Sequence, residues 1–218
     1  MRLAGQVLEL LLGHALMALG IATSTASDLG TTPVSSLPLV GSLISGLSLG
    51  ATTILVNVTL LALQALILRR DFRPVQLLQL ICLVWFGPFI DAAVWSLDRL
   101  GVGYTAYWQQ WALTLAGIVL VGVGVAFQVH ARLLVLPGDG FSQALTFALQ
   151  RRFGPSPRFE FGRVKVLADT GQVLISLVLA LVFLGGFVGV REGTLAAAFG
   201  VGWVVTWVMR VLPPTQAR

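Results

Sequence analysis

Six separate stretches of the sequence are each apolar over about 20 residues, the length that a helix needs to cross the hydrocarbon core of a bilayer. A spanning segment must satisfy its backbone hydrogen bonds internally, so each stretch is expected to be a helix. The sequence therefore predicts an all-α polytopic membrane protein with six transmembrane helices. They cover roughly residues 5–26, 49–69, 75–97, 108–130, 164–188 and 192–212.

Composition supports this interpretation. Apolar residues make up 56% of the 218 residues and charged residues 11%, whereas soluble domains carry about 25% charged residues. The formal charge of +5 is attributed to membrane topology, and no nucleic-acid partner is expected. One cysteine and two histidines leave no metal-ligand cluster, and no nucleotide or dinucleotide motif occurs, so we expect neither metal nor cofactor.

Lysine and arginine positions predict the orientation. With the N-terminus in the cytoplasm, every Lys and Arg except Arg99 and Arg191 falls on the cytoplasmic side, including Arg2 and Arg218 near the chain ends. The positive-inside rule therefore favours a multi-pass protein of the cytoplasmic membrane with both termini in the cytoplasm.

The two halves of the chain, 1–104 and 105–218, show an internal repeat. Residues 13–22 align with 117–126 at an offset of 104, which also places Pro33 on Pro137; at an offset of 112, Asn57 falls on Asp169. Each half holds three spans, so the second repeat is expected to be inverted in the membrane. Inverted repeats with short or broken helices are common in secondary transporters, although channels and non-transporting proteins contain them too.

Two short segments between spans begin at Pro33 and Pro137 and are predicted to be short, re-entrant helices. Small polar residues at their starts could hold a polar, including an anionic, substrate group, because helix N-termini favour negative charge. Tight turns shaped by Gly and Pro are the alternative. The candidate substrate-binding residues are Thr31, Thr32, Ser35, Gly138, Asp139, Gly140 and Ser142.

Ionisable and polar residues within the spans are the candidates for substrate or ion coupling: Asp169, its repeat partner Asn57, His14 and Glu9. Such groups are costly in a bilayer and usually face protein or a water-filled cavity. For Asp169 the alternatives are a structural hydrogen bond between helices or an ion pair with Lys165 or Arg163. For His14 the alternative is a single structural hydrogen bond.

Several short motifs resemble the YczE/YyaS/YitT group of bacterial membrane proteins. They are Leu29-Gly30-Thr31-Thr32-Pro33, Leu68-Arg69-Arg70-Asp71-Phe72, Phe86-Gly87-Pro88-Phe89-Ile90-Asp91 and Leu136-Pro137-Gly138-Asp139-Gly140-Phe141. The resemblance implies a location in the cytoplasmic membrane and no particular substrate.

Taken together, the sequence predicts a secondary transporter or facilitator of a small polar metabolite, with the bilayer and the solute as partners. A homo-oligomer or a protein partner is left open. The main alternative is a non-transporting accessory or regulatory membrane protein. An enzyme is not expected, because few ionisable residues are available to converge on one site; a channel would need a pore but no alternating access.

Overall fold

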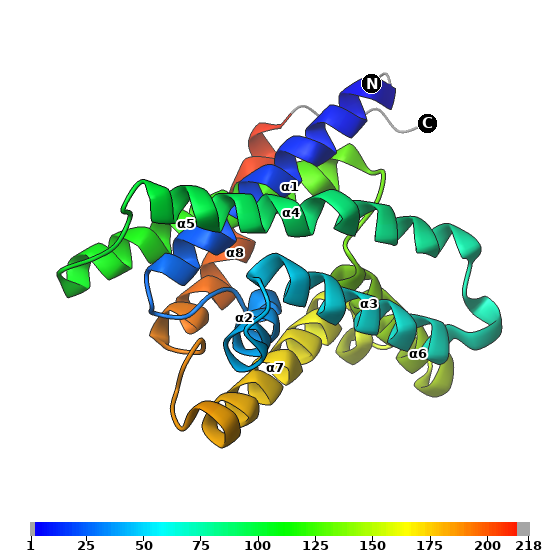
Figure 1. Cartoon of the computed structure of the whole chain (residues 1–218). Helices are drawn as coiled ribbons and strands as arrows, with labels where there is room; N and C mark the ends of the chain where they lie inside the picture. The colour runs from blue at the N-terminus through cyan, green and yellow to red at the C-terminus, as the bar shows by residue number, and fades with distance from the viewer. Residues whose placement is uncertain (1–2, 213–218) are drawn as a thin grey trace.

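The computed structural model describes residues 3–212, and in this range it is helical and contains no strand (Figure 1). Arg2 and Arg218, which entered the topology prediction, lie outside the described residues. The α-helices are α1 Leu3–Ala26, α2 Pro33–Ser45, α3 Leu49–Leu68, α4 Gln79–Arg99, α5 Tyr107–Ala131, α6 Pro137–Phe153, α7 Phe161–Leu179 and α8 Glu192–Val211. Short helical turns, η1 Arg69–Asp71, η2 Pro74–Leu78, η3 Pro157–Phe159 and the π-turn η4 Ala180–Leu184, join or extend them.

Six of these helices are long and apolar enough to span a membrane, which confirms the predicted all-α, six-span class. Their outer faces carry large apolar side chains that a soluble protein would bury. On α8, for example, Phe199 is 81% exposed and Trp203 is 72% exposed. Exposed apolar surface on this scale is stable only against lipid, so the chain is a multi-pass membrane protein.

Glycines bring α1 and α5 into close contact. A Cβ added to Gly20 would lie 2.8 Å from the carbonyl oxygen of Gly117, and one added to Gly13 would lie 2.8 Å from that of Gly124. The two backbones are therefore in direct contact, as small residues permit at membrane helix interfaces.

Two helices, α4 and α8, pack on this pair, and the other four pack mainly on one another. α4 lies on α1 and α8 lies on α5, while α2 packs on α7 and α3 packs on α6 (Figure 1). The two short helices also contact their own neighbours in sequence, α2 with α3 and α6 with α7.

Both short helices begin at the predicted prolines, Pro33 and Pro137. Near their starts, Ser35 and Ser36 of α2 and Pro137 and Gly138 of α6 are buried, whereas Ser45 and Phe153 at the far ends are exposed. The two starts lie close together, since a Cβ on Gly138 would be 3.4 Å from the Cγ1 atom of Val34. Two helix N-termini from different halves of the chain thus meet inside the molecule.

The two halves differ in how their last two spans pack. In the first half α4 lies directly on α3: a Cβ on Gly50 would lie 2.2 Å from the Gly87 carbonyl oxygen. The Asp91 carboxylate accepts hydrogen bonds from the Gly50 amide and the Ser48 hydroxyl, both at 2.7 Å, and so ties α4 to the start of α3. In the second half, no extended packing joins α7 to α8 over the described residues.

Candidate functional site

A cavity of about 820 Å³ lies where the starts of α2 and α6 meet, and it extends between α7 and α8. α5 and α8 give it an apolar wall that includes Val121, Val125, Val201 and Val205. The polar side chains that line it are Thr32, Ser35, Thr53, Asn57, Gln76, Gln79, Gln128, Arg132, Asp139, Gln143, Lys165 and Asp169. An apolar pocket with a few converging polar groups is the usual form of a small-molecule site.

Lys165 connects two carboxylates at this cavity. Its Nζ atom is 2.7 Å from Oδ1 of Asp139 and 3.4 Å from Oδ2 of Asp169. Asp139 lies in the first turn of α6, whereas Lys165 and Asp169 are one turn apart on α7. Oδ1 of Asp169 is buried and has no hydrogen-bond partner. The ammonium group of Lys165 thus pairs with two carboxylates, and Oδ1 of Asp169 remains without a partner.

A chain of hydrogen bonds continues from this cluster through α5 and α1 to α4. Asp139 accepts from Nε2 of Gln128 at 3.3 Å, and Oε1 of Gln128 lies 2.9 Å from Nε2 of His14. Trp85 donates to Nδ1 of His14 at 2.9 Å. Because the indole N–H can only donate, Nδ1 must accept and Nε2 must donate to Gln128. The ring of His14 is therefore neutral in this arrangement.

The structure brings six of the predicted site residues together at the cavity. These are Asp169, Asn57, Thr32, Ser35, Gly138 and Asp139. Asp139 does not cap its own helix, because its carboxylate is bonded to Lys165 and Gln128 instead. Asp169 has the lysine partner that was the alternative interpretation, and it also lines the cavity.

The other predicted residues lie outside the cavity wall. Gly140 is covered by Gln64 and Gln79, and Ser142 is buried within α6. Thr31 is buried, with its hydroxyl unpartnered. His14 is linked to the cavity only through Gln128.

Glu9 lies apart from the cavity, near the N-terminal end of α1. Its carboxylate pairs with His130 at the end of α5, and both side chains are largely buried. The neighbouring Gln6 donates to the Ala131 carbonyl at 3.0 Å. This group of contacts joins the ends of α1 and α5, and its residues are not among those that line the cavity.

Sequence reasoning missed two participants, Gln128 and Trp85. Gln128 had a usable signal, because an amide inside an otherwise apolar span needs a polar partner. Trp85 had none, because tryptophans in membrane helices usually serve as interfacial anchors or packing residues. Among the described residues, no group of His, Cys, Asp and Glu could hold a metal ion.

The cluster can exchange charge without a metal or a cofactor. A proton or a cationic group that reaches Asp169 would compete with Lys165 for the carboxylate, and the lysine would then shift towards Asp139. The site therefore combines a solute-sized space with paired ionisable groups in its wall.

Residues 4–210 match the model of a family of unknown function (DUF6198). No curated protein and no solved structure matches the chain.

Proposed function

The chain belongs to the DUF6198 family, and from the geometry of its cavity we propose that it is a secondary transporter or facilitator of a small polar metabolite. The observation that carries the proposal is the cavity of about 820 Å³ at the meeting point of two short helices, with the Asp139–Lys165–Asp169 cluster in its wall. Ionisable groups that face a cavity within membrane-spanning helices are characteristic of substrate and ion pathways.

We further propose that the halves are inverted repeats, because equivalent helices make equivalent contacts. The helices α1 to α4 of the first half correspond in order to α5 to α8 of the second. The α1–α4 contact therefore corresponds to the α5–α8 contact, and the α3–α6 contact to the α7–α2 contact. The central glycines follow the same rule: Gly13 meets Gly124 and Gly20 meets Gly117. Such reciprocal contacts are the mark of a two-fold axis.

Polar contacts beside the short helices support the same axis. Gln64 donates to the Pro137 carbonyl at the start of α6. Its repeat counterpart is Ser176, whose hydroxyl oxygen lies 3.1 Å from that of Ser36. The Ser36 hydroxyl in turn donates to the Pro33 carbonyl at the start of α2.

The cavity lies on this proposed axis and is chemically unequal on its two sides. The second half contributes Asp139, Lys165 and Asp169, and the equivalent positions in the first half are Ser35, Thr53 and Asn57, which also line the cavity. We infer a division of roles, in which the charged side carries the coupling ion and the neutral side hydrogen-bonds the substrate.

This division also indicates where an anionic substrate group would lie. The first turn of α6 contains Asp139, which already compensates the positive helix end, whereas the first turn of α2 contains no acid. An anionic group would therefore lie against the start of α2, near Thr32 and Ser35.

His14 and Glu9 receive different roles within the proposal. His14, neutral and bonded on both ring nitrogens, positions Gln128 and through it Asp139. Glu9 joins α1 to α5 through His130. We propose that coupling rests on Asp169 and Asp139, with Asn57 as a substrate contact.

The resemblance to the YczE/YyaS/YitT group, the orientation with both termini in the cytoplasm, and the cytoplasmic membrane as location stay predictions. A homo-oligomer or a protein partner is compatible with the proposal, and no enzymatic activity is part of it.

The proposal predicts that Asp169→Asn removes the pH response of the protein. Thermal stabilisation of purified protein is first measured against a panel of small carboxylates, amino acids and amines at two pH values, because a ligand that binds only the folded state raises the melting temperature. Uptake of a stabilising compound into proteoliposomes is then expected to rise when the outside is acidified. The variant should lose that rise, with a drop of about tenfold, typical of coupling between sites.

Asp98→Asn is the matched control, because Asp98 is exposed on α4 and does not line the cavity. It should leave uptake unchanged. No stabilising compound at either pH would favour the non-transporting accessory protein, and an unchanged pH response in Asp169→Asn would remove Asp169 from the coupling mechanism.

A further inference from the structure

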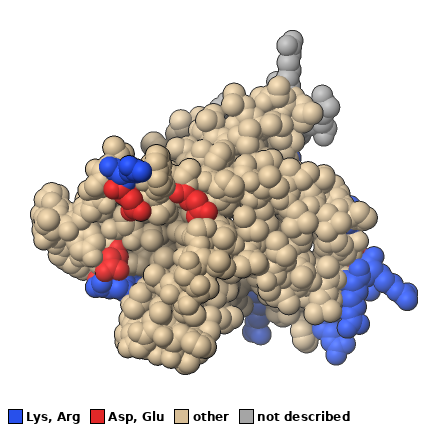
Figure 2. All heavy atoms as spheres, in the orientation of Figure 1, with Lys and Arg blue, Asp and Glu red and all other residues tan. Residues whose placement is uncertain are grey.

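A second hollow, of about 870 Å³, lies at the basic end of the molecule, and nothing in the transport proposal uses it. It is an open groove between the C-terminal end of α3 with η1 on one side and α6 on the other. We call it the arginine groove; its lining residues are Ile67, Leu68, Arg69, Arg70, Asp71, Phe147, Ala148, Arg151 and Arg152. Figure 2 shows basic side chains gathered at this end, whereas the acidic side chains in view lie at the opposite end.

The groove brings together two pairs of arginines that are about 80 residues apart in the sequence. Asp71 is the one acidic residue that lines the groove, and it is paired with Arg151. Arg69, Arg70 and Arg152 make no ion pair with a described acid, so the groove carries a net positive charge.

The shape of the groove is fixed from both sides. The Asp71–Arg151 ion pair joins η1 to α6. The rings of Phe153 and Phe159 stack with centroids 5.7 Å apart, and Gln150 donates to the Phe159 carbonyl at 2.8 Å, which holds the end of α6 in place.

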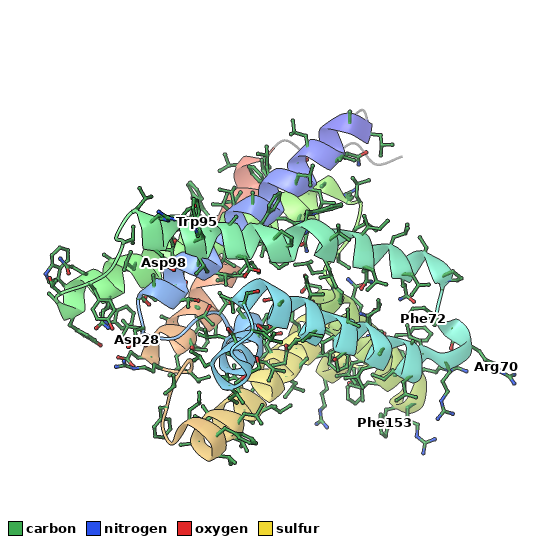
Figure 3. All side chains as sticks on the ribbon, viewed as in Figure 1. Asp28, Arg70, Phe72, Trp95, Asp98 and Phe153 are labelled. Atoms are coloured by element: carbon green, nitrogen blue, oxygen red, sulfur yellow. The ribbon has the colours of Figure 1, made fainter. Side chains whose placement is uncertain are left out.

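The depth of the groove in the membrane follows from the helices that form it. The second membrane-spanning segment ends at Asp71, so the arginines lie at the level of the lipid headgroups. Ile67, Leu68 and Phe147 form apolar walls on the bilayer side of the arginines. Figure 3 shows Arg70, Phe72 and Phe153 projecting from this same end.

We propose that the arginine groove binds the headgroup of an anionic phospholipid, with the phosphate held by the unpaired arginines and an acyl chain against Ile67 and Phe147. Guanidinium groups bind phosphate through paired N–H donors, and basic pockets between membrane helices are suited to anionic headgroups. The positive-inside rule explains why arginines lie on this side of the membrane. It does not explain why four of them converge on one groove with apolar walls.

The test uses the full-length protein in nanodiscs of phosphatidylcholine with a minor fraction of phosphatidylglycerol, and counts retained lipids by native mass spectrometry. The wild type is expected to retain phosphatidylglycerol in preference to phosphatidylcholine. The double variant Arg70→Ala/Arg152→Ala should lower that preference about 25-fold, since each basic residue contributes about fivefold to anionic-lipid binding. The control Arg163→Ala/Arg210→Ala removes the same charge from exposed positions outside the groove and should change the preference less than twofold, in line with weaker, non-specific attraction.

Three results would overturn the proposal: no preference in the wild type, an equal loss in both double variants, or displacement of the lipid by millimolar inorganic phosphate. The last would identify a site for free phosphate in place of lipid. Preserved helix content and a single monodisperse peak for each variant show that a loss is not due to unfolding.

Discussion

Replacing Lys165 with Met is expected to destabilise the protein by about 3 kcal/mol, because it leaves Asp139 and Asp169 facing each other without their shared cation. The three side chains are between 20% and 30% exposed, so water in the cavity screens them partly and the effect falls at the low end of values for broken buried ion pairs. Reversible unfolding of the purified protein in mixed micelles measures this change.

A double-mutant cycle tests the cause. Lys165→Met/Asp139→Asn removes one acid together with the lysine and is expected to be more stable than Lys165→Met alone, because no second carboxylate then repels Asp169. Arg163→Met removes the same charge at an exposed position two residues away, and it should change the free energy of unfolding little. If Arg163→Met lost as much stability as Lys165→Met, the Asp139–Lys165–Asp169 cluster would have no special role in stability.

The second large effect is expected at the contact of α1 with α5. Gly20→Ala adds a Cβ that would lie 2.7 Å from the Val121 amide nitrogen and 2.8 Å from the Gly117 carbonyl oxygen. Both atoms belong to the backbone, so the helices must separate, and we expect a loss of at least about 2 kcal/mol, as for other overpacked sites. The same unfolding assay, together with the yield of folded protein from membranes, measures it.

Gly171→Ala on α7 is the matched control. No atom lies within 4 Å of the position that its Cβ would take, so this change should preserve or slightly raise stability through higher helix propensity. Equal behaviour of the two alanine variants would contradict the close packing of α1 on α5.

Much of this architecture could be predicted from the sequence because the bilayer imposes strong local rules. Segment length and apolarity predicted the six spans, and the start signals at Pro33 and Pro137 predicted the two short helices. Asp169 was chosen because it is an ionisable residue within a span, and Asn57 because the offset between the halves places it at the equivalent position; both line the cavity.

The partners of these residues could not be predicted, because they depend on how the helices pack. Nothing local indicates that Lys165 bridges to Asp139, 26 positions earlier, or that Trp85 fixes the tautomer of His14. The difference between the tied α3–α4 pair and the separated α7–α8 pair is likewise a property of the assembled molecule. Arg69 and Arg152 each satisfy the topology rule alone, so their convergence on one groove was equally hidden.

The contrast between the joined α3–α4 pair and the separated α7–α8 pair suggests how the proposed transport would work. With α3 and α4 joined by Asp91, the cavity in this structure extends between α7 and α8. If the repeats exchange conformations, α7 and α8 close while α3 and α4 part, and the same residues face the other side of the membrane. Ser35, which lines the cavity in the first turn of α2, would then be accessible to solutes from each side of the membrane in turn.

The most direct test of this central claim is the reactivity of a single cysteine at Ser35. In a Cys82→Ala background, Ser35→Cys lines the cavity, whereas Ser45→Cys lies at the exposed end of the same helix. A membrane-impermeant maleimide is added to right-side-out and to inside-out vesicles. We predict that Ser35→Cys is modified in both preparations and Ser45→Cys in one of them; modification of Ser35→Cys in one preparation alone, or in neither, would contradict a transporter.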